Sequence, residues 1–474
     1  MPQPDSPLSN YLKQISQAVR HHDGAQLAQL TNPQFPAEWR ASLAPELQSL
    51  QQAYSSGAVD DDPLPAVALR AGLPEDYLEF VVACLRFIAV KDSRDFYDSA
   101  GAILTAFCRP TFLYEQWQAP VLRTLCEGLI RLALDRDAFL SKKHGNRKTT
   151  AFNLQNRFSV VMSQILADKQ NPSESRSSAL IVANIALRFY VRIDEWQLCN
   201  KLLLQVERGR LDHAQYPKSQ RVTYHFLIGR LKLFYHGFKL AEKHLAFALT
   251  HCHKDAIANR RRIFPLIVTT RLVRGLLPSA HLLQKYNVHE QFGPLIQAFR
   301  RGHFSAYYAA LEAHAQYFAS LGVYYILRHR TAALLYRNLF RTVSLITENT
   351  GSIKQIEYDS LLRAAQIAGA TDIDANGIES VIALLIAHGY LKGYTLPARG
   401  KLILSKSTPF PHPYAVAQAR GTSSASSVGK ARPKPIRRVS SVQPGPSSVQ
   451  GVAGSYFGGA AGGGGSLRRP SRRI

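Results

Sequence analysis

The sequence contains little of what membrane proteins and disulfide-stabilised or zinc-bound domains depend on. Its 474 residues include only five cysteines, and no two of them form a Cys-x-x-Cys pair, which argues against a disulfide framework or a zinc cluster. No apolar run approaches the ~20 residues that cross a bilayer, and the first residues lack the basic and then apolar order of a signal peptide. We therefore expect a soluble intracellular protein in a reducing compartment.

The recurring catalytic and cofactor motifs are also missing. The chain has no His-Glu-x-x-His, no Gly-x-Ser-x-Gly and no Gly-x-x-x-x-Gly-Lys-[Ser/Thr] pattern. His251, Cys252 and His253 are consecutive, and consecutive helical residues point in different directions, so they cannot share one ion. The sequence therefore predicts a protein that is not an enzyme and that needs no metal or cofactor.

Acidic residues are scarce in the second half of the chain. The whole sequence has 58 Lys and Arg against 33 Asp and Glu, a formal net charge of +25. Residues 1–220, 221–300, 301–411 and 412–474 carry net charges of +1, +10, +4 and +10. Such asymmetry is the footprint of a polyanionic partner, most often a phosphate backbone. An acidic protein partner, or a surface kept soluble by Lys and Arg, would produce the same pattern.

Helical periodicity dominates the first three quarters of the chain. Between about 8 and 349, apolar residues recur every three or four positions and short breaks separate the segments, which is typical of an α-solenoid. In one predicted hairpin, Gly229, Ala241, Leu245 and Ala248 match the small and large positions of a tetratricopeptide repeat. We expect small residues there to let two helices approach closely.

The pattern changes after the helix predicted at 331–349. Two short helices follow within 357–389, and then two strands at 390–394 and 401–405, which is the element order of a winged helix. The fold class predicted is mostly α: an α-solenoid of tetratricopeptide-like hairpins, a winged-helix cap and a disordered basic tail. The expected domains are N-terminal helical repeats over 1–175, tetratricopeptide-like helices over 176–330, a winged helix over 331–411 and the tail over 412–474.

A helical array that ends in a winged helix is the plan of the PCI domain. Within it, GRLKLFYHGFKLAEKHLAFALTHCHKDAIANRRR (229–262) and RLVRGLLPS (271–279) resemble the PCI proteins called COP9-signalosome-subunit-twelve-like. The later segments YRNLF (336–340), HGYLKGY (388–394) and LILSKSTPFP (402–411) are similar to the same family's signature. The resemblance covers roughly 180–411, and the segments occur in the family's order.

This resemblance implies a non-catalytic scaffold subunit of the nuclear transcription-and-export complex two, which couples transcription to messenger-RNA export at the nuclear pore. It implies a nuclear location with some cytoplasmic protein, and no membrane. The implied partners are a PCI-containing scaffold subunit, a small acidic Sem-type protein, and RNA or DNA bound through phosphates. Two alternatives stay open: a COP9-signalosome or proteasome-lid-type assembly subunit without nucleic-acid binding, and a sister branch linked to transcription elongation and splicing.

Basic residues of the second half are the candidate nucleic-acid contacts. Three consecutive arginines, 260–262, point around a helix, so at least one should face outward toward phosphate. For this cluster, which includes Arg271 and Arg274 on the next turns, an intramolecular clamp on Asp60–Asp62 or Glu242 is the alternative. The helix at 374–388 has no Lys or Arg, which predicts salt-dependent phosphate binding without base readout. The candidate contacts are Arg260, Arg261, Arg262, Arg271, Arg274, Arg328, Arg330, Arg337, Arg341, Lys392, Arg399, Lys401 and Lys406.

Three further groups of residues are of interest. Val381, Leu384 and Leu385 are core residues or, alternatively, part of a partner interface. In the tail, Ser440 and Ser471 follow basic pairs and are candidate phosphorylation sites, where phosphate would subtract about two charges each. The predicted nuclear import signal consists of Lys430, Arg432, Lys434, Arg437 and Arg438.

Overall fold

The computed structural model describes most of the chain up to residue 419. The described residues are 6–34, 37–55, 62–90, 95–108, 116–144, 149–167, 178–349 and 355–419. The predicted import signal, Ser440 and Ser471 lie outside the described residues, as do Asp60 and Asp61 of the proposed clamp.

Helices fill the N-terminal half, and local sequence signals set their ends. The first helix starts after Ser6, whose side chain accepts a hydrogen bond from the backbone N–H of Ser9 at 3.1 Å. Its face of Leu8, Leu12 and Ile15 is fully buried. In chain order the elements are α1 (Pro7–Arg20), α2 (Gly24–Leu30), α3 (Ala37–Ser55), α4 (Pro63–Arg70), α5 (Glu75–Ala89), α6 (Phe96–Phe107), η2 (Gln116–Gln118), α7 (Ala119–His144), α8 (Thr149–Ala167), α10 (Ala179–Arg192) and α11 (Trp196–Arg208).

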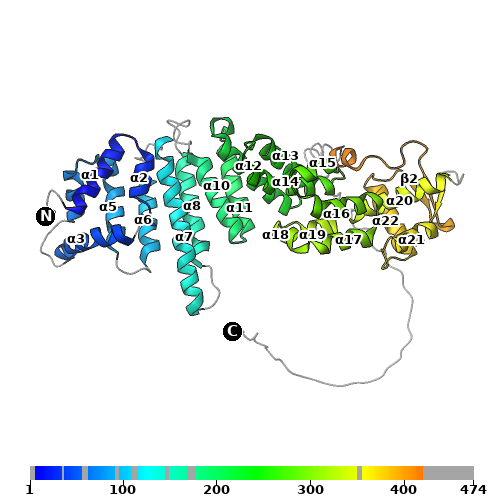
Figure 1. Cartoon of the computed structure of the whole chain (residues 1–474), viewed down its shortest axis with the longest axis horizontal. Helices are drawn as coiled ribbons and strands as arrows, with labels where there is room; N and C mark the ends of the chain where they lie inside the picture. Colours follow the sequence, from blue (N-terminus) through cyan, green and yellow to red (C-terminus); the bar gives the residue numbers. More distant parts are fainter. Residues whose placement is uncertain are drawn as a thin grey trace, which may run out of the picture. The chain divides into compact units, whose positions relative to one another are not determined.

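Helices continue through the middle of the chain, where neighbours in sequence pack against each other (Figure 1). Helices α12 and α13 form the predicted hairpin: a Cβ on Gly229 would come within 2.6 Å of the Leu245 side chain, so the close approach is confirmed. The elements are η4 (His213–Gln215), α12 (Lys218–Phe234), α13 (Phe238–His251), α14 (Ile257–Val273), α15 (Ala280–Lys285), α16 (His289–Arg301), α17 (Phe304–Ala313), α18 (Ala315–Ser320), α19 (Tyr324–Arg330) and α20 (Ala332–Asn349).

The hydrophobic core has two parts that divide within α12. The first part runs from Leu8 to Leu231 and the second from Leu233 to Leu404, while the half-buried Phe226 packs against both. The division therefore lies in α12, and the first core passes without a break through the boundary expected at 175. This continuity is what stacked helical hairpins produce, because each one buries its faces on its neighbours.

A small α/β module follows α20. It contains β1 (Gln355–Glu357), α21 (Tyr358–Ile367), α22 (Ala375–Ala387), β2 (Gly393–Leu396), η5 (Pro397–Arg399) and β3 (Lys401–Leu404). Strand β3 pairs antiparallel with both other strands, in the order β1-β3-β2. Asp374 is the N-cap residue of α22, and its carboxylate accepts a hydrogen bond from the backbone N–H of Gly377 at 2.7 Å. Helices α20, α21 and α22 pack on one another.

One strand and two boundaries differ from the sequence predictions. Strand β1 was not expected, because three residues are too few to show an alternating pattern. The first hairpin strand begins at Gly393 instead of Tyr390, because Gly389 adopts a left-handed conformation and a bend follows it. Residues 413–419 are helical, so ordered structure extends beyond the expected end at Pro411.

None of the helices in the described ranges is long and apolar enough to span a bilayer. The five cysteines are buried thiols. Burial raises the pKa of Cys108 and of Cys199, each to about 12, so neither thiol ionises readily.

Candidate nucleic-acid interface

The arginine triplet lies on the first turns of α14, and its three side chains go to different environments. Arg260 is half-buried and donates a hydrogen bond to the Tyr286 hydroxyl at 3.1 Å, with its guanidinium 5.9 Å from that ring's centre. Arg261 and Arg262 are exposed. Two of the three arginines therefore face outward, and their contact with phosphate stays a prediction.

The two arginines at the other end of α14 both pair with Glu242, and Arg274 is buried by this contact whereas Arg271 is partly exposed. Arg274 is 5% exposed and pairs with one oxygen of the buried Glu242 carboxylate. Arg271 donates to the other oxygen at 3.0 Å, and the Tyr414 hydroxyl lies 3.1 Å from that same oxygen. The Arg274 guanidinium also lies 4.5 Å from the centre of the Tyr414 ring. Arg271 and Arg274 thus have the geometry of the intramolecular clamp, with Glu242 as its carboxylate.

Two further candidate contacts, Arg328 of α19 and Arg337 of α20, are also engaged within the fold. Arg337 is 6% exposed and donates to the carbonyls of Phe410 and Pro411, each at 2.9 Å. Burial, and secondly the charge of Arg341, lower the pKa of Arg337 to about 10. Arg328 donates to a Glu312 oxygen at 2.5 Å and to the Tyr324 hydroxyl at 2.9 Å. Arg337 is thus a structural group that holds the segment after β3 against α20.

The hairpin of the α/β module presents most of its predicted cations to solvent. Arg399 is exposed in the short turn between β2 and β3, next to Gly400, whose φ of +60° closes that turn. Lys392 and Lys406 are also exposed. Lys401 is half-buried, and its Nζ lies 3.5 Å from a carboxylate oxygen of Glu357 on the paired strand β1.

Six of the predicted contacts are exposed and form no ion pair with a carboxylate in the ranges that the structure describes. Because their charges are not compensated locally, they remain available to an external anion. These residues, which we call the open cations, are Arg261, Arg262, Arg330, Arg341, Lys392 and Arg399.

The apolar residues predicted on α22 are divided between core and surface. Leu385 is fully buried, so it belongs to the core and cannot contact a partner. Val381 is half-buried, whereas Leu384 is 44% exposed. Ile367 of α21 is also exposed, at 83%, as is Ile346 of the preceding helix α20, at 62%. The interface alternative is therefore open for Leu384 and Val381 only.

A cluster of histidines fills the seam between α12 and α13. The Nδ1 atoms of His225 and His244 are 2.8 Å apart, so one nitrogen donates a hydrogen bond and the other accepts it. The two rings therefore cannot both be in the doubly protonated, cationic form. Burial, and secondly the charge of His244, lower the pKa of His225 to about 4. Burial, and secondly Lys243, lower the pKa of His244 to about 4. The hairpin is therefore built for neutral histidines.

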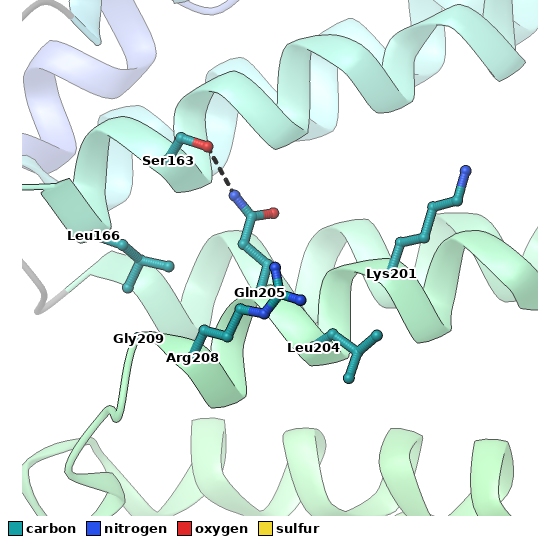
Figure 2. Close-up of a pocket in the computed structure, with 7 residues that line it drawn as sticks. All are labelled: Ser163, Leu166, Lys201, Leu204, Gln205, Arg208 and Gly209. Atoms are coloured by element: carbon teal, nitrogen blue, oxygen red, sulfur yellow. Dashed lines mark hydrogen bonds between the residues drawn. The ribbon is translucent and has the colours of Figure 1, made fainter.

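A pocket of about 620 Å³ lies between α8 and α11 (Figure 2). The amide of Gln205 reaches across it and donates to the Ser163 hydroxyl at 2.9 Å. Lys201 and Arg208, both exposed, line the same pocket. We regard this pocket as the seam between two helices, and its two cations were not among the predicted contacts.

Within the described ranges, no group of three or more His, Cys, Asp and Glu side chains is placed to hold a metal ion. Cys252 is buried, while His251 and His253 are exposed. Sequence reasoning missed Tyr414 as a partner of Glu242 and Arg274. Its one available signal was the aromatic ring just after the expected end of the fold.

The described part of the chain is therefore a helical-repeat protein that ends in a small α/β module and carries open cations on both parts.

The chain is 27% identical over 416 residues to PCI domain-containing protein 2 of Xenopus laevis, covering 85% of this chain and 97% of that protein. It is 25% identical to Enhanced ethylene response protein 5 of Arabidopsis thaliana, covering 85% and 95%. A PCI domain-containing protein of Schizosaccharomyces pombe is 30% identical over 253 residues, 52% of this chain and 57% of that protein. Two of these three relatives are named as PCI domain-containing proteins.

No protein-family model matches the chain.

Proposed function

We propose that this protein is a non-catalytic PCI scaffold subunit of a nuclear complex that couples transcription to messenger-RNA export. In this proposal the module after α20 is a winged helix that pairs with a PCI partner. A small acidic Sem-type protein binds the helical array, and RNA or DNA binds the open cations through phosphates. The tail from 420 carries the import signal.

The observation that carries the nucleic-acid part is the set of open cations on α14, α19, α20 and the β2–β3 hairpin. Arginine and lysine without a local counterion attract phosphate, and each contact adds affinity that salt weakens. Helix α22 has no Lys or Arg, which supports phosphate contacts without sequence reading. Relatives named as PCI domain proteins support the scaffold part.

The test is the affinity of the purified full chain for a fluorescent 20-nucleotide single-stranded RNA, measured by anisotropy. The variant replaces three open cations of three elements with glutamate, Arg261→Glu, Arg341→Glu and Arg399→Glu, and none of them has a described ion pair to break. We expect more than a tenfold loss of affinity, because each reversal removes one phosphate contact and adds repulsion.

The matched control makes the same charge change on exposed residues of the N-terminal half: Arg131→Glu, Lys201→Glu and Arg208→Glu. Because net charge falls equally in both variants, only local contacts can separate them. Equal losses of affinity in the two variants, or no binding by the wild-type chain, would defeat the nucleic-acid part of the proposal.

A second candidate is an assembly subunit of the signalosome or proteasome-lid type that does not bind nucleic acid. It is favoured by the internal engagement of Arg274 and Arg337. It is also favoured by three exposed apolar residues, Ile346 of α20 and Ile367 and Leu384 of the α/β module. Affinity purification of the tagged full chain from cells separates the two candidates. Export-complex subunits recovered together with RNA support the first candidate, and signalosome or lid subunits without RNA support the second.

A further inference from the structure

A second pocket, of about 670 Å³, lies where α10, α12 and α14 meet. Its lining contains four cations and no acidic residue: Arg188 of α10, Lys218 and Arg230 of α12, and Arg262 of α14. His251 and His253 are also part of the lining. A pocket of this size is in the range of sites that hold a small ligand or one group of a larger one.

Arg230 is the cation that most needs an anion. Its side chain is only partly exposed, and its guanidinium forms no hydrogen bond or ion pair with another described residue. Burial lowers the pKa of Arg230, which reflects the cost of holding a charge there without a counterion. An anion that entered the pocket would remove this cost and gain a charge-assisted hydrogen bond.

The rest of the lining suits a flat apolar group beside that anion. The lining also includes the apolar side chains of Val222, Phe226 and Ile263, the hydroxyl of Thr223 and the amide of Asn259. Helix α14 begins at this pocket without a side-chain cap, so its first turn adds positive potential. A nucleotide combines these two requirements, because its base is flat and largely apolar and its phosphate is anionic.

We infer that this pocket receives one nucleotide of a bound single strand, with the phosphate on Arg230 and the base against Phe226. Arg262 lines the pocket and is also an open cation, so the next phosphate of the strand continues onto α14. The inference rests on the proposed nucleic-acid function and adds a specific subsite to it.

The experiment uses the full chain and two probes, uridine 5′-monophosphate by calorimetry and a 20-nucleotide oligouridine by anisotropy. The first variant is Arg230→Met, because methionine keeps much of the aliphatic length of the arginine side chain, and the second is Arg262→Met at an exposed position. The control is Arg208→Met, in the pocket shown in Figure 2. We expect about a tenfold loss for both probes with Arg230→Met, the size of one charge-assisted hydrogen bond, and less than twofold with Arg208→Met. Far-UV circular dichroism verifies folding.

Photocrosslinking maps the site independently of affinity. An oligomer with one 4-thiouridine is expected to crosslink to peptides that contain Phe226 or Cys252, which line the pocket. If the oligomer binds but its crosslinks lie elsewhere and Arg230→Met behaves like Arg208→Met, the inference is overturned and the proposed function stands. If the wild-type chain binds neither probe, both this inference and the proposed nucleic-acid function are refuted. Competition by an oligoglutamate peptide at lower concentration than the nucleotide would instead identify a peptide site and overturn the inference.

Discussion

Replacing Glu242 with glutamine should destabilise the protein strongly without weakening nucleic-acid binding. The Glu242 and Arg274 side chains are 8% and 6% exposed, so the substitution leaves a buried guanidinium without its counterion. Removing one partner of such a pair costs about 3 to 5 kcal/mol. Arg271 adds little, because its side chain is 40% exposed and exposed pairs contribute about 1 kcal/mol or less.

The free energy of unfolding is obtained from urea titrations at pH 7 followed by circular dichroism. The control is Glu290→Gln, an exposed glutamate of α16, for which we expect a change below about 0.5 kcal/mol. The double variant Glu242→Leu with Arg274→Met should recover much of the stability, because an apolar pair replaces a buried ion pair at little cost. A loss below about 1 kcal/mol in Glu242→Gln would refute the claim that this carboxylate holds Arg274 in the fold.

Three other perturbations have expected outcomes. Lowering the pH from 6.5 toward 4 should decrease the free energy of unfolding. His225 and His244 have folded-state pKa values near 4, so the unfolded chain takes up protons at a higher pH than the folded chain does. A free energy of unfolding that does not change over this pH range would contradict the prediction. Arg337→Met should cost about 2 kcal/mol and speed proteolysis within 409–419, because two carbonyls lose their donor; unchanged cleavage would argue against this role. Gly302→Ala should lower the melting temperature by several degrees, because its φ is +74° and the new methyl would meet the Leu339 backbone at 2.4 Å; an unchanged melting temperature would contradict that contact.

The helices and their close approaches could be predicted because they depend on neighbouring residues. Apolar periodicity indicated α12 and α13, and the lack of a side chain at Gly229 indicated where Leu245 would pack. Asp374 indicated the start of α22 for the same reason, since a helix cap involves residues three positions apart. Signals of this kind lie within one turn or one hairpin, so the sequence displays them directly.

The sequence offered Glu242 as an alternative clamp, but it could not show which arginines are held inside the fold, because their partners are distant in sequence. Glu242 precedes Arg274 by 32 positions and Tyr414 by 172. Arg337 is held by carbonyls 73 and 74 positions further along the chain. Charge counting treats all of these side chains alike, so it cannot separate a buried clamp from an open cation. The pocket around Arg230 was missed for the same reason, since its lining comes from four helices, α10, α12, α13 and α14.

The dependence of RNA affinity on salt tests the central claim most directly. For the wild-type chain, the logarithm of the association constant should fall linearly with the logarithm of the salt concentration, by about 0.7 per phosphate neutralised on a single strand. The variant with Arg261, Arg341 and Arg399 changed to glutamate should give a slope shallower by about 2, whereas the control triple of the N-terminal half should keep the wild-type slope. An affinity that is insensitive to salt, or a slope that is the same in all three proteins, would contradict the account.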